Sequence, residues 1–139
     1  MTTTRRASAQ WHGSLLEGAG KVTLESSGIG TYPVSWPARS TEPNGVTSPE
    51  ELLAAAHSTC FSMALSNALA KAGTPPTQLD TSAEVDFLPG TGITAIRLTV
   101  TGDVPGLDAA GFKAAAEAAK EGCPVSQALK AVPITLTVN

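Results

Sequence analysis

The most continuous pattern along the chain is a long stretch of apolar and small residues that follows Ser-Pro-Glu-Glu at positions 48–51. Ser48 is suited to the N-cap of a helix, and Glu51 is the acid expected three positions later in a capping box. Apolar or small side chains then occupy nearly every face until Gly73 provides a stop signal. We therefore predict a central helix over residues 49–71 that is buried on more than one side.

Alternating polarity predicts strands on both sides of this helix. Residues 77–88 and 93–101 each alternate with one face suited to a core, and the Pro-Gly-Thr-Gly sequence between them predicts a hairpin. Residues 8–11 and 21–26 form a second candidate hairpin across a Gly-rich turn. Residues 31–37 are a weaker strand candidate, because their two prolines favour an edge or a loop.

The remaining segments complete an α+β pattern. Residues 39–48 contain a Pro-Asn-Gly turn signal and are predicted to be irregular. Asp108 is suited to cap a helix over residues 109–120, which Glu-Gly would end. A short helix over residues 125–129 and a final strand over residues 134–138 follow.

The length of the chain favours one domain, residues 1–139, because 139 residues can bury a substantial core. Only 15% of the residues are charged, which favours a surface partly covered by a second copy of the chain. The net charge of −3 without a basic cluster argues against nucleic acid as a partner. No run approaches the ~18 consecutive apolar residues of a membrane span. The sequence after Arg5-Arg6 is too polar for a signal segment, so we expect a cytoplasmic protein that does not bind membranes.

The two cysteines, Cys60 and Cys123, are the strongest candidates for chemistry. A reducing cytoplasm disfavours a structural disulfide, which leaves two interpretations: buried small apolar residues or reactive thiols. Cys60 lies in the middle of the apolar helix, where burial raises the pKa of a thiol. A reactive Cys60 therefore needs a nearby cation. The candidates are His57, one turn earlier, and Arg39, in the segment before the helix.

Glu50 precedes Cys60 by ten residues, which is about 15 Å along one helix. A pair formed by Arg39 and Glu50 could reach Cys60 only if the chain folds back or if a second subunit supplies the pair, and we favour the second subunit. The alternative is that Glu50 is a first-turn acid stabilised by the helix dipole. Cys123 directly precedes Pro124 at a helix start, where backbone N–H groups favour a thiolate.

Other kinds of chemistry find little support in the sequence. The histidines and cysteines lack a zinc-binding spacing, no Gly-rich phosphate loop precedes a helix, and no Gly-x-Ser-x-Gly motif occurs. We therefore expect no metal and no organic cofactor. We expect His57 to pack or hydrogen-bond among the helices.

Two segments of the chain resemble the motifs of the osmotically inducible protein C (OsmC) family. Residues 48–65, SPEELLAAAHSTCFSMAL, resemble its signature helix, and residues 122–129, GCPVSQAL, resemble its second cysteine motif. The resemblance extends over nearly the whole chain, including Trp-His-Gly at 11–13. The segment around Cys60 is closer to the OsmC branch than to the sister organic hydroperoxide resistance branch. Residues 17–21 lack the arginine that the sister branch carries in this loop, which supports the same assignment.

The resemblance implies an α+β subunit with antiparallel sheets packed around a long central helix, assembled as an intertwined homodimer. It implies a thiol peroxidase that reduces organic hydroperoxides, and hydrogen peroxide less well, in oxidative and osmotic stress defence. By motif position, Cys60 corresponds to the peroxidatic cysteine and Cys123 to the resolving cysteine, with a disulfide between them. Glu50 corresponds to the catalytic acid and Arg39 to the activating arginine. The implied reductant is a lipoyl-type dithiol.

Two other functions are compatible with the same residues. The fold could hold a small apolar ligand between subunits with both cysteines passive, or it could sense redox state through the disulfide without turnover. A mass loss of about two daltons after one equivalent of hydroperoxide would argue against a passive pair, because disulfide formation removes two hydrogens. Steady-state peroxide consumption with a dithiol would argue against a sensor.

Overall fold

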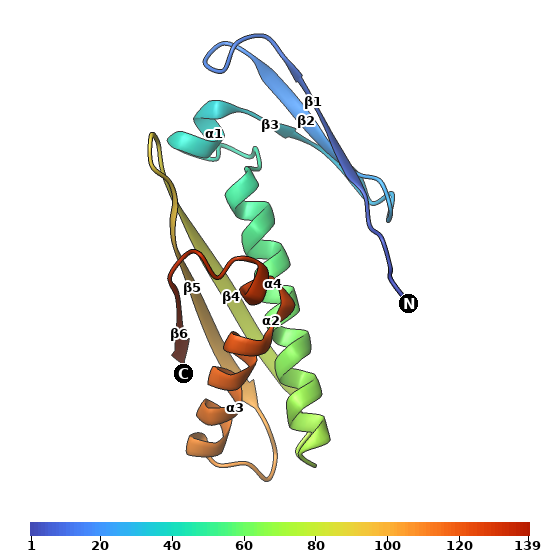
Figure 1. The fold of residues 1–139 in the computed structure, drawn as a ribbon, viewed down its shortest axis with the longest axis vertical. Helices are drawn as coiled ribbons and strands as arrows, with labels where there is room; N and C mark the ends of the chain where they lie inside the picture. Colours follow the sequence, from blue (N-terminus) through green and yellow to red (C-terminus); the bar gives the residue numbers. More distant parts are fainter. The chain divides into compact units, whose positions relative to one another are not determined.

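The computed structural model describes residues 1–139, which divide into two compact units, Met1–Glu50 and Glu51–Asn139. The first unit contains a three-stranded sheet of order β1-β2-β3, and the second contains a three-stranded sheet of order β4-β5-β6 (Figure 1). The elements in chain order are β1 (Ala7–His12), β2 (Ala19–Leu24), β3 (Gly30–Val34), α1 (Trp36–Ser40), α2 (Pro49–Lys71), β4 (Gln78–Leu88), β5 (Gly92–Asp103), α3 (Ala109–Gly122), α4 (Pro124–Ala128) and β6 (Ile134–Val138).

The first unit contains the predicted N-terminal hairpin and one helix that was not predicted. β1 and β2 pair antiparallel, and β3 adds to β2 as an edge strand in which Pro33 is accommodated. The strand expected to continue to residue 37 ends at Val34, and α1 follows. Ser35 caps this helix, since its side chain accepts a hydrogen bond from the Ala38 N–H at 3.3 Å. Pro37 suits the first helical turn because its φ is already fixed near the helical value. The N–H that proline lacks would have had no partner within the helix at this position.

α2 has the predicted bounds, but the chain itself buries only one stripe of it. Fully or almost fully buried positions recur every four residues at His57, Phe61, Leu65 and Leu69. The opposite face is exposed, and Met63 has 68% of its surface accessible. The expectation of burial on more than one side is therefore wrong for a single chain, because no other element of the second unit covers that face.

By length and composition alone, α2 is also long and apolar enough to cross a membrane. Core helices of soluble proteins meet the same criterion, so this property is weak evidence for a membrane location. Only 22% of the most apolar stretch of α2 is buried inside the molecule. The exposed apolar surface of α2 therefore remains a feature that the function has to explain.

The sheet of the second unit is mixed. β4 and β5 form the predicted hairpin with a bulge between Asp86 and Phe87, whereas β6 runs parallel to β5. A parallel neighbour requires a long crossover, and here α3 and α4 form that crossover. The α+β class with small sheets and one long helix is confirmed, and β6 is the exception to the antiparallel pairing that we expected.

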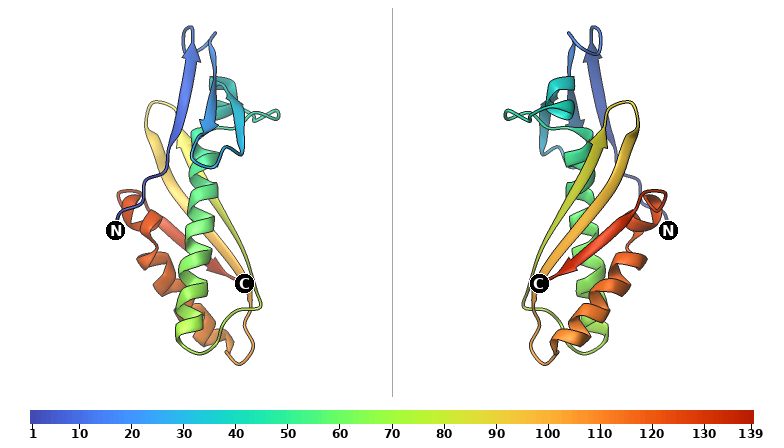
Figure 2. Two further views of the ribbon diagram at one scale, coloured as in Figure 1. Left: turned by 90° about the vertical axis from the view of Figure 1, so that its right-hand side faces the viewer. Right: turned by 90° about the vertical axis from the view of Figure 1, so that its left-hand side faces the viewer.

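The core of the second unit lies between the sheet and two helices. Phe61 and Leu65 of α2 pack with Leu98 of β5 and Phe112 of α3 in one buried cluster. Figures 1 and 2 show α2 and α3 side by side along the sheet. Asp108 caps α3 as predicted, accepting a hydrogen bond from the Gly111 N–H at 2.7 Å. Because α3 is fixed by this core, the position of the chain immediately after it is also fixed.

Candidate active site

The two cysteines are neighbours in the folded second unit. Cys60 lies in the middle of α2, and Cys123 lies at the junction where α3 ends and α4 begins. Both are free thiols, and their side chains lie close enough for Cys123 to act on the pKa of Cys60. Cys123 is fully buried, whereas Cys60 is partly exposed. A reagent from solvent would therefore meet Cys60 first, with Cys123 directly behind it.

The surroundings of Cys60 act on its pKa in opposite directions. Burial raises the pKa of the Cys60 thiol, and the hydrogen bond and charge interaction with Cys123 raise it further. The backbone N–H of Val125 donates a hydrogen bond to Cys60, which lowers the pKa, but the net direction is upward. A thiolate at Cys60 thus needs a cation in addition to the groups that surround it in this unit.

The hydrogen bond from Val125 was not foreseen from the sequence. We expected the free N–H groups at this helix start to favour a thiolate at Cys123, but one of them is directed at Cys60. Pro124 has no N–H, so Val125 supplies the first available donor of α4. The Cys-Pro dipeptide indicated free backbone N–H groups at this helix start. Which thiol accepts a hydrogen bond from them depends on the tertiary contact between α4 and α2.

Arg39 and Glu50 form an ion pair within the first unit. The Arg39 guanidinium, on α1, donates from Nη2 to Oε1 of Glu50 at 2.8 Å and from Nε to the same oxygen at 3.0 Å. Glu50 lies in the first turn of α2, and its side chain is 8% exposed. The segment of Arg39 was expected to be irregular, but α1 gives this side chain a defined origin. The four predicted site residues therefore form two pairs, one in each unit.

His57 forms a third polar pair. Its Nε2 lies 2.7 Å from the Oγ of Ser126 on α4, in a hydrogen bond between two buried residues. Burial lowers the pKa of His57, so the neutral imidazole is favoured and this residue is a poor source of positive charge for Cys60. Nδ1 of the ring is buried without a partner. The expectation that His57 packs and hydrogen-bonds among the helices is confirmed, and Ser126 is a partner that the sequence did not reveal.

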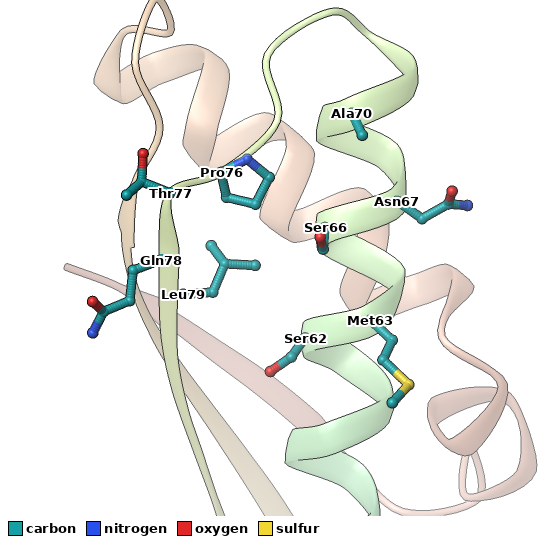
Figure 3. Close-up of a pocket in the computed structure, with 9 residues that line it drawn as sticks. All are labelled: Ser62, Met63, Ser66, Asn67, Ala70, Pro76, Thr77, Gln78 and Leu79. Atoms are coloured by element: carbon teal, nitrogen blue, oxygen red, sulfur yellow. The ribbon is translucent and has the colours of Figure 1, made fainter.

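An open groove lies farther along α2. It has a volume of about 640 Å³ and runs between the second half of the helix and the start of β4 (Figure 3). Neither cysteine lines it. Ser62 and Met63 line the end of the groove that is nearest in sequence to Cys60. The thiols therefore do not lie at the bottom of this groove.

Comparison with known proteins identifies the family. The family model described as OsmC-like protein matches residues 42–138. Two curated relatives, each named Peroxiredoxin OsmC, from Escherichia coli (strain K12) and Shigella flexneri, are both 44% identical over 134 residues. The match covers 94% of this chain and 93% of each relative. The chain belongs to the OsmC family.

Solved structures agree on the fold. An organic hydroperoxide resistance protein OsmC from Legionella pneumophila superimposes with a TM-score of 0.74 at 24% identity, covering 99% of both chains. The organic hydroperoxide resistance protein OhrB of Bacillus subtilis superimposes with a TM-score of 0.69 at 22% identity, covering 96% of this chain and 98% of its own. Both identities are low, so these two structures are evidence for the OsmC-like fold alone.

Proposed function

We propose that this OsmC-family chain is a thiol peroxidase that reduces hydroperoxides, organic ones better than hydrogen peroxide. The observation that carries the proposal is the contact between two free thiols, one partly exposed and one buried. The two curated relatives named Peroxiredoxin OsmC support the same activity. Cys60 also packs against the apolar cluster of the second unit, and such surroundings suit an organic peroxide better than hydrogen peroxide.

The reaction has two steps on the protein. The Cys60 thiolate attacks the distal peroxide oxygen, the O–O bond breaks, and the leaving alkoxide takes up a proton as an alcohol. Cys60 is thereby oxidised to a sulfenic acid. The sulfur of Cys123 then attacks the sulfur of Cys60, the S–O bond breaks, and hydroxide leaves with the Cys123 proton as water. The product is a Cys60–Cys123 disulfide. The two cysteines have together lost the two electrons that reduced the peroxide.

The thiolate in the first step needs a positive charge, because the second unit by itself raises the pKa of Cys60. In the proposal Arg39 supplies that charge and also stabilises the negative charge that develops on the peroxide oxygens. Glu50 orients Arg39 through the hydrogen bonds that join the two side chains. An arginine paired with an acid in this way presents a fixed fork of donors to an anionic site.

A homodimer completes the proposed site, with one subunit supplying Arg39 to the thiol of its partner. The support for a second copy is the exposed face of α2, which includes Met63 at 68% exposure, in a helix whose most apolar stretch is only 22% buried in the single chain. Burying such a face against a second copy removes apolar surface from water. The low charged fraction of 15% favours the same assembly.

A small dithiol of the lipoyl type is the proposed reductant. A first thiolate of the donor attacks the Cys60–Cys123 disulfide, and its second thiol releases the donor as a cyclic disulfide, which returns both cysteines to the reduced state. Cys60 is the more accessible sulfur and is therefore the site of attack. The cytoplasm is the compartment that we propose, because it keeps such donors reduced.

The experiment is a comparison of the wild-type chain with Cys60→Ser and Cys123→Ser in the consumption of cumene hydroperoxide with dihydrolipoamide. We expect no turnover by Cys60→Ser, and one turnover without cycling by Cys123→Ser. Full activity of Cys60→Ser would overturn the proposal. A wild-type chain whose mass does not change with one equivalent of hydroperoxide would favour a ligand-binding protein, and disulfide formation without steady-state consumption would favour a sensor.

A further inference from the structure

The hydrogen bond between His57 and Ser126 lies one helical turn away from the contact between the two thiols. His57 precedes Cys60 by three positions on α2, and Ser126 follows Cys123 by three positions at the start of α4. His57 contacts Ser126, and Cys60 contacts Cys123. One turn of α2 therefore faces one turn of α4 through two successive pairs of side chains.

α4 has few means of holding its own position. It is a helix of five residues, far below the length at which a helix is stable without tertiary contacts. Its polar links to α3 come from the Cys123 N–H to the Ala119 oxygen at 2.9 Å, and from the Gln127 side-chain amide to the Glu121 oxygen. These links hold the start of α4 to the end of α3, and across to α2 the helix is joined by the Val125 N–H to Cys60 and by the His57–Ser126 hydrogen bond.

The thiol pair needs that alignment to be correct. A shift of α4 by one turn along α2 is about 5 Å, whereas a disulfide requires a sulfur–sulfur distance of about 2 Å and closely placed Cα atoms. The His57–Ser126 hydrogen bond is directional, and both of its residues are buried, at 0% and 4% exposure. Apolar packing alone would tolerate sliding of α4, while a buried hydrogen bond penalises it.

We infer that His57 and Ser126 are positioning residues for disulfide formation, because their buried hydrogen bond holds α4 in the register that places Cys123 against Cys60. The inference rests on the proposed function in assigning Cys123 as the thiol that attacks Cys60. Neither His57 nor Ser126 touches the peroxide in this role. Their contribution is to the second step, so their loss should slow resolution of an oxidised Cys60 rather than its formation.

The test uses dithiobis(nitrobenzoate), so that it does not depend on peroxide chemistry. The Cys60 thiolate attacks the reagent's disulfide, which releases one thionitrobenzoate and leaves a mixed disulfide on Cys60. Cys123 then attacks Cys60, the Cys60–Cys123 bond forms, and a second thionitrobenzoate leaves while the Cys123 proton goes to solvent. The two phases of colour release separate the reaction of Cys60 from its resolution in the full-length chain.

We expect Ser126→Ala to slow the second phase by about tenfold, a change that corresponds to ~1.4 kcal/mol, and to alter the first phase by less than about twofold. Ser126→Thr keeps a hydroxyl and should restore the second phase to within about threefold of the wild-type rate. Ser62→Ala is the matched control, because Ser62 is a hydrogen-bonded serine on α2 whose partner is Thr81 on β4. It should leave both phases unchanged.

Three results would overturn the inference: a wild-type second phase in Ser126→Ala, an equal slowing of both phases, or a second phase in Ser126→Thr as slow as in Ser126→Ala. If Ser126→Ala does not fold, the double variant His57→Leu, Ser126→Ala removes both polar groups and leaves no unpaired ring nitrogen. A fast second phase in that folded double variant would equally reject the role. A second phase that survives Cys123→Ser would reject the proposed function itself, which is a different outcome.

Discussion

The guanidinium of Arg39 encloses the carboxylate of Glu50, with Nε bonded to both carboxylate oxygens at 3.0 and 3.2 Å and Nη2 bonded to one of them at 2.8 Å. The two side chains are unequally covered, since Arg39 is 32% exposed and Glu50 is 8% exposed. The acid therefore depends on the arginine for compensation of its charge more than the arginine depends on the acid. The pair also ties α1 to the first turn of α2.

Arg39→Ala should destabilise the protein, because it leaves the Glu50 carboxylate covered but unpaired. We expect the free energy of unfolding to fall by ~2 kcal/mol, measured by urea denaturation. Arg39→Lys retains the charge without the planar fork and should lose less. Glu50→Gln in the Arg39→Ala background should recover part of the loss. Wild-type stability of Arg39→Ala would show that water compensates the carboxylate fully.

The same Arg39→Ala variant should react more slowly at Cys60. If Arg39 stabilises the thiolate, the rate of Cys60 alkylation by iodoacetamide at neutral pH should fall by about tenfold, which is one unit of pKa. Arg97→Ala is a control, because Arg97 pairs with Glu84 and Asp86 on an exposed part of the sheet. An unchanged alkylation rate in Arg39→Ala would point to a different cation.

Cys123→Ala should lower the pKa of Cys60, since the hydrogen bond and the charge interaction with Cys123 both raise it. The pH profile of Cys60 alkylation should therefore move to lower pH in this variant. Cys123→Ser retains a hydroxyl that can hydrogen-bond to Cys60 and should move the profile less. A profile that moves to higher pH in Cys123→Ala would contradict the assignment of the contact.

His57 should make the free energy of unfolding decrease at acidic pH. Burial holds the pKa of His57 below its ordinary value of 6.5, so the unfolded chain binds a proton where the folded chain does not. The free energy of unfolding is therefore fully retained above about pH 6.5 and declines as the pH falls below it. His57→Gln should flatten this decline in urea titrations between about pH 7 and pH 5. An identical slope in His57→Gln would refute the prediction.

Met63→Glu should test the proposed homodimer. Met63 is 68% exposed, so a charge there costs a single chain little, but it would be costly within an apolar interface. We expect sedimentation velocity to show a shift from dimer to monomer with the fold preserved. Thr91→Glu, in the exposed turn between β4 and β5, controls for one added negative charge. A wild-type distribution of dimer and monomer in Met63→Glu would place this face outside any interface.

Much of the local structure could be predicted because its signals lie close together in sequence. Asp108 as a cap, the hairpin around Pro89-Gly90-Thr91-Gly92 and the bounds of α2 all depend on neighbouring residues. The short helix α1 escaped prediction because Pro37 was interpreted, together with Pro33, as a sign of an edge strand or a loop, although Pro37 after Ser35 also suits a helix start. Local propensity leaves such short segments undecided.

For the candidate site, the sequence named residues but did not reveal the contacts that they make. The motifs pointed to both cysteines, Arg39 and Glu50, and the family is the one that they resemble. Ser126 as the partner of His57, and the Val125 amide directed at Cys60, depend on how α4 meets α2. The crossover that places β6 parallel to β5 determines how α4 packs against α2. No local sequence pattern encodes that crossover.

The contact between Cys60 and Cys123 joins positions more than sixty residues apart in the chain. A disulfide at this point would close a loop that spans most of the second unit and would restrict the unfolded ensemble, a stabilisation of about 4 kcal/mol in the chain-entropy treatment. Oxidation would then strengthen the fold instead of damaging it. The reduced chain, ready to react, would be the more easily unfolded form, and each encounter with an oxidant would leave the molecule temporarily more resistant to heat and proteolysis.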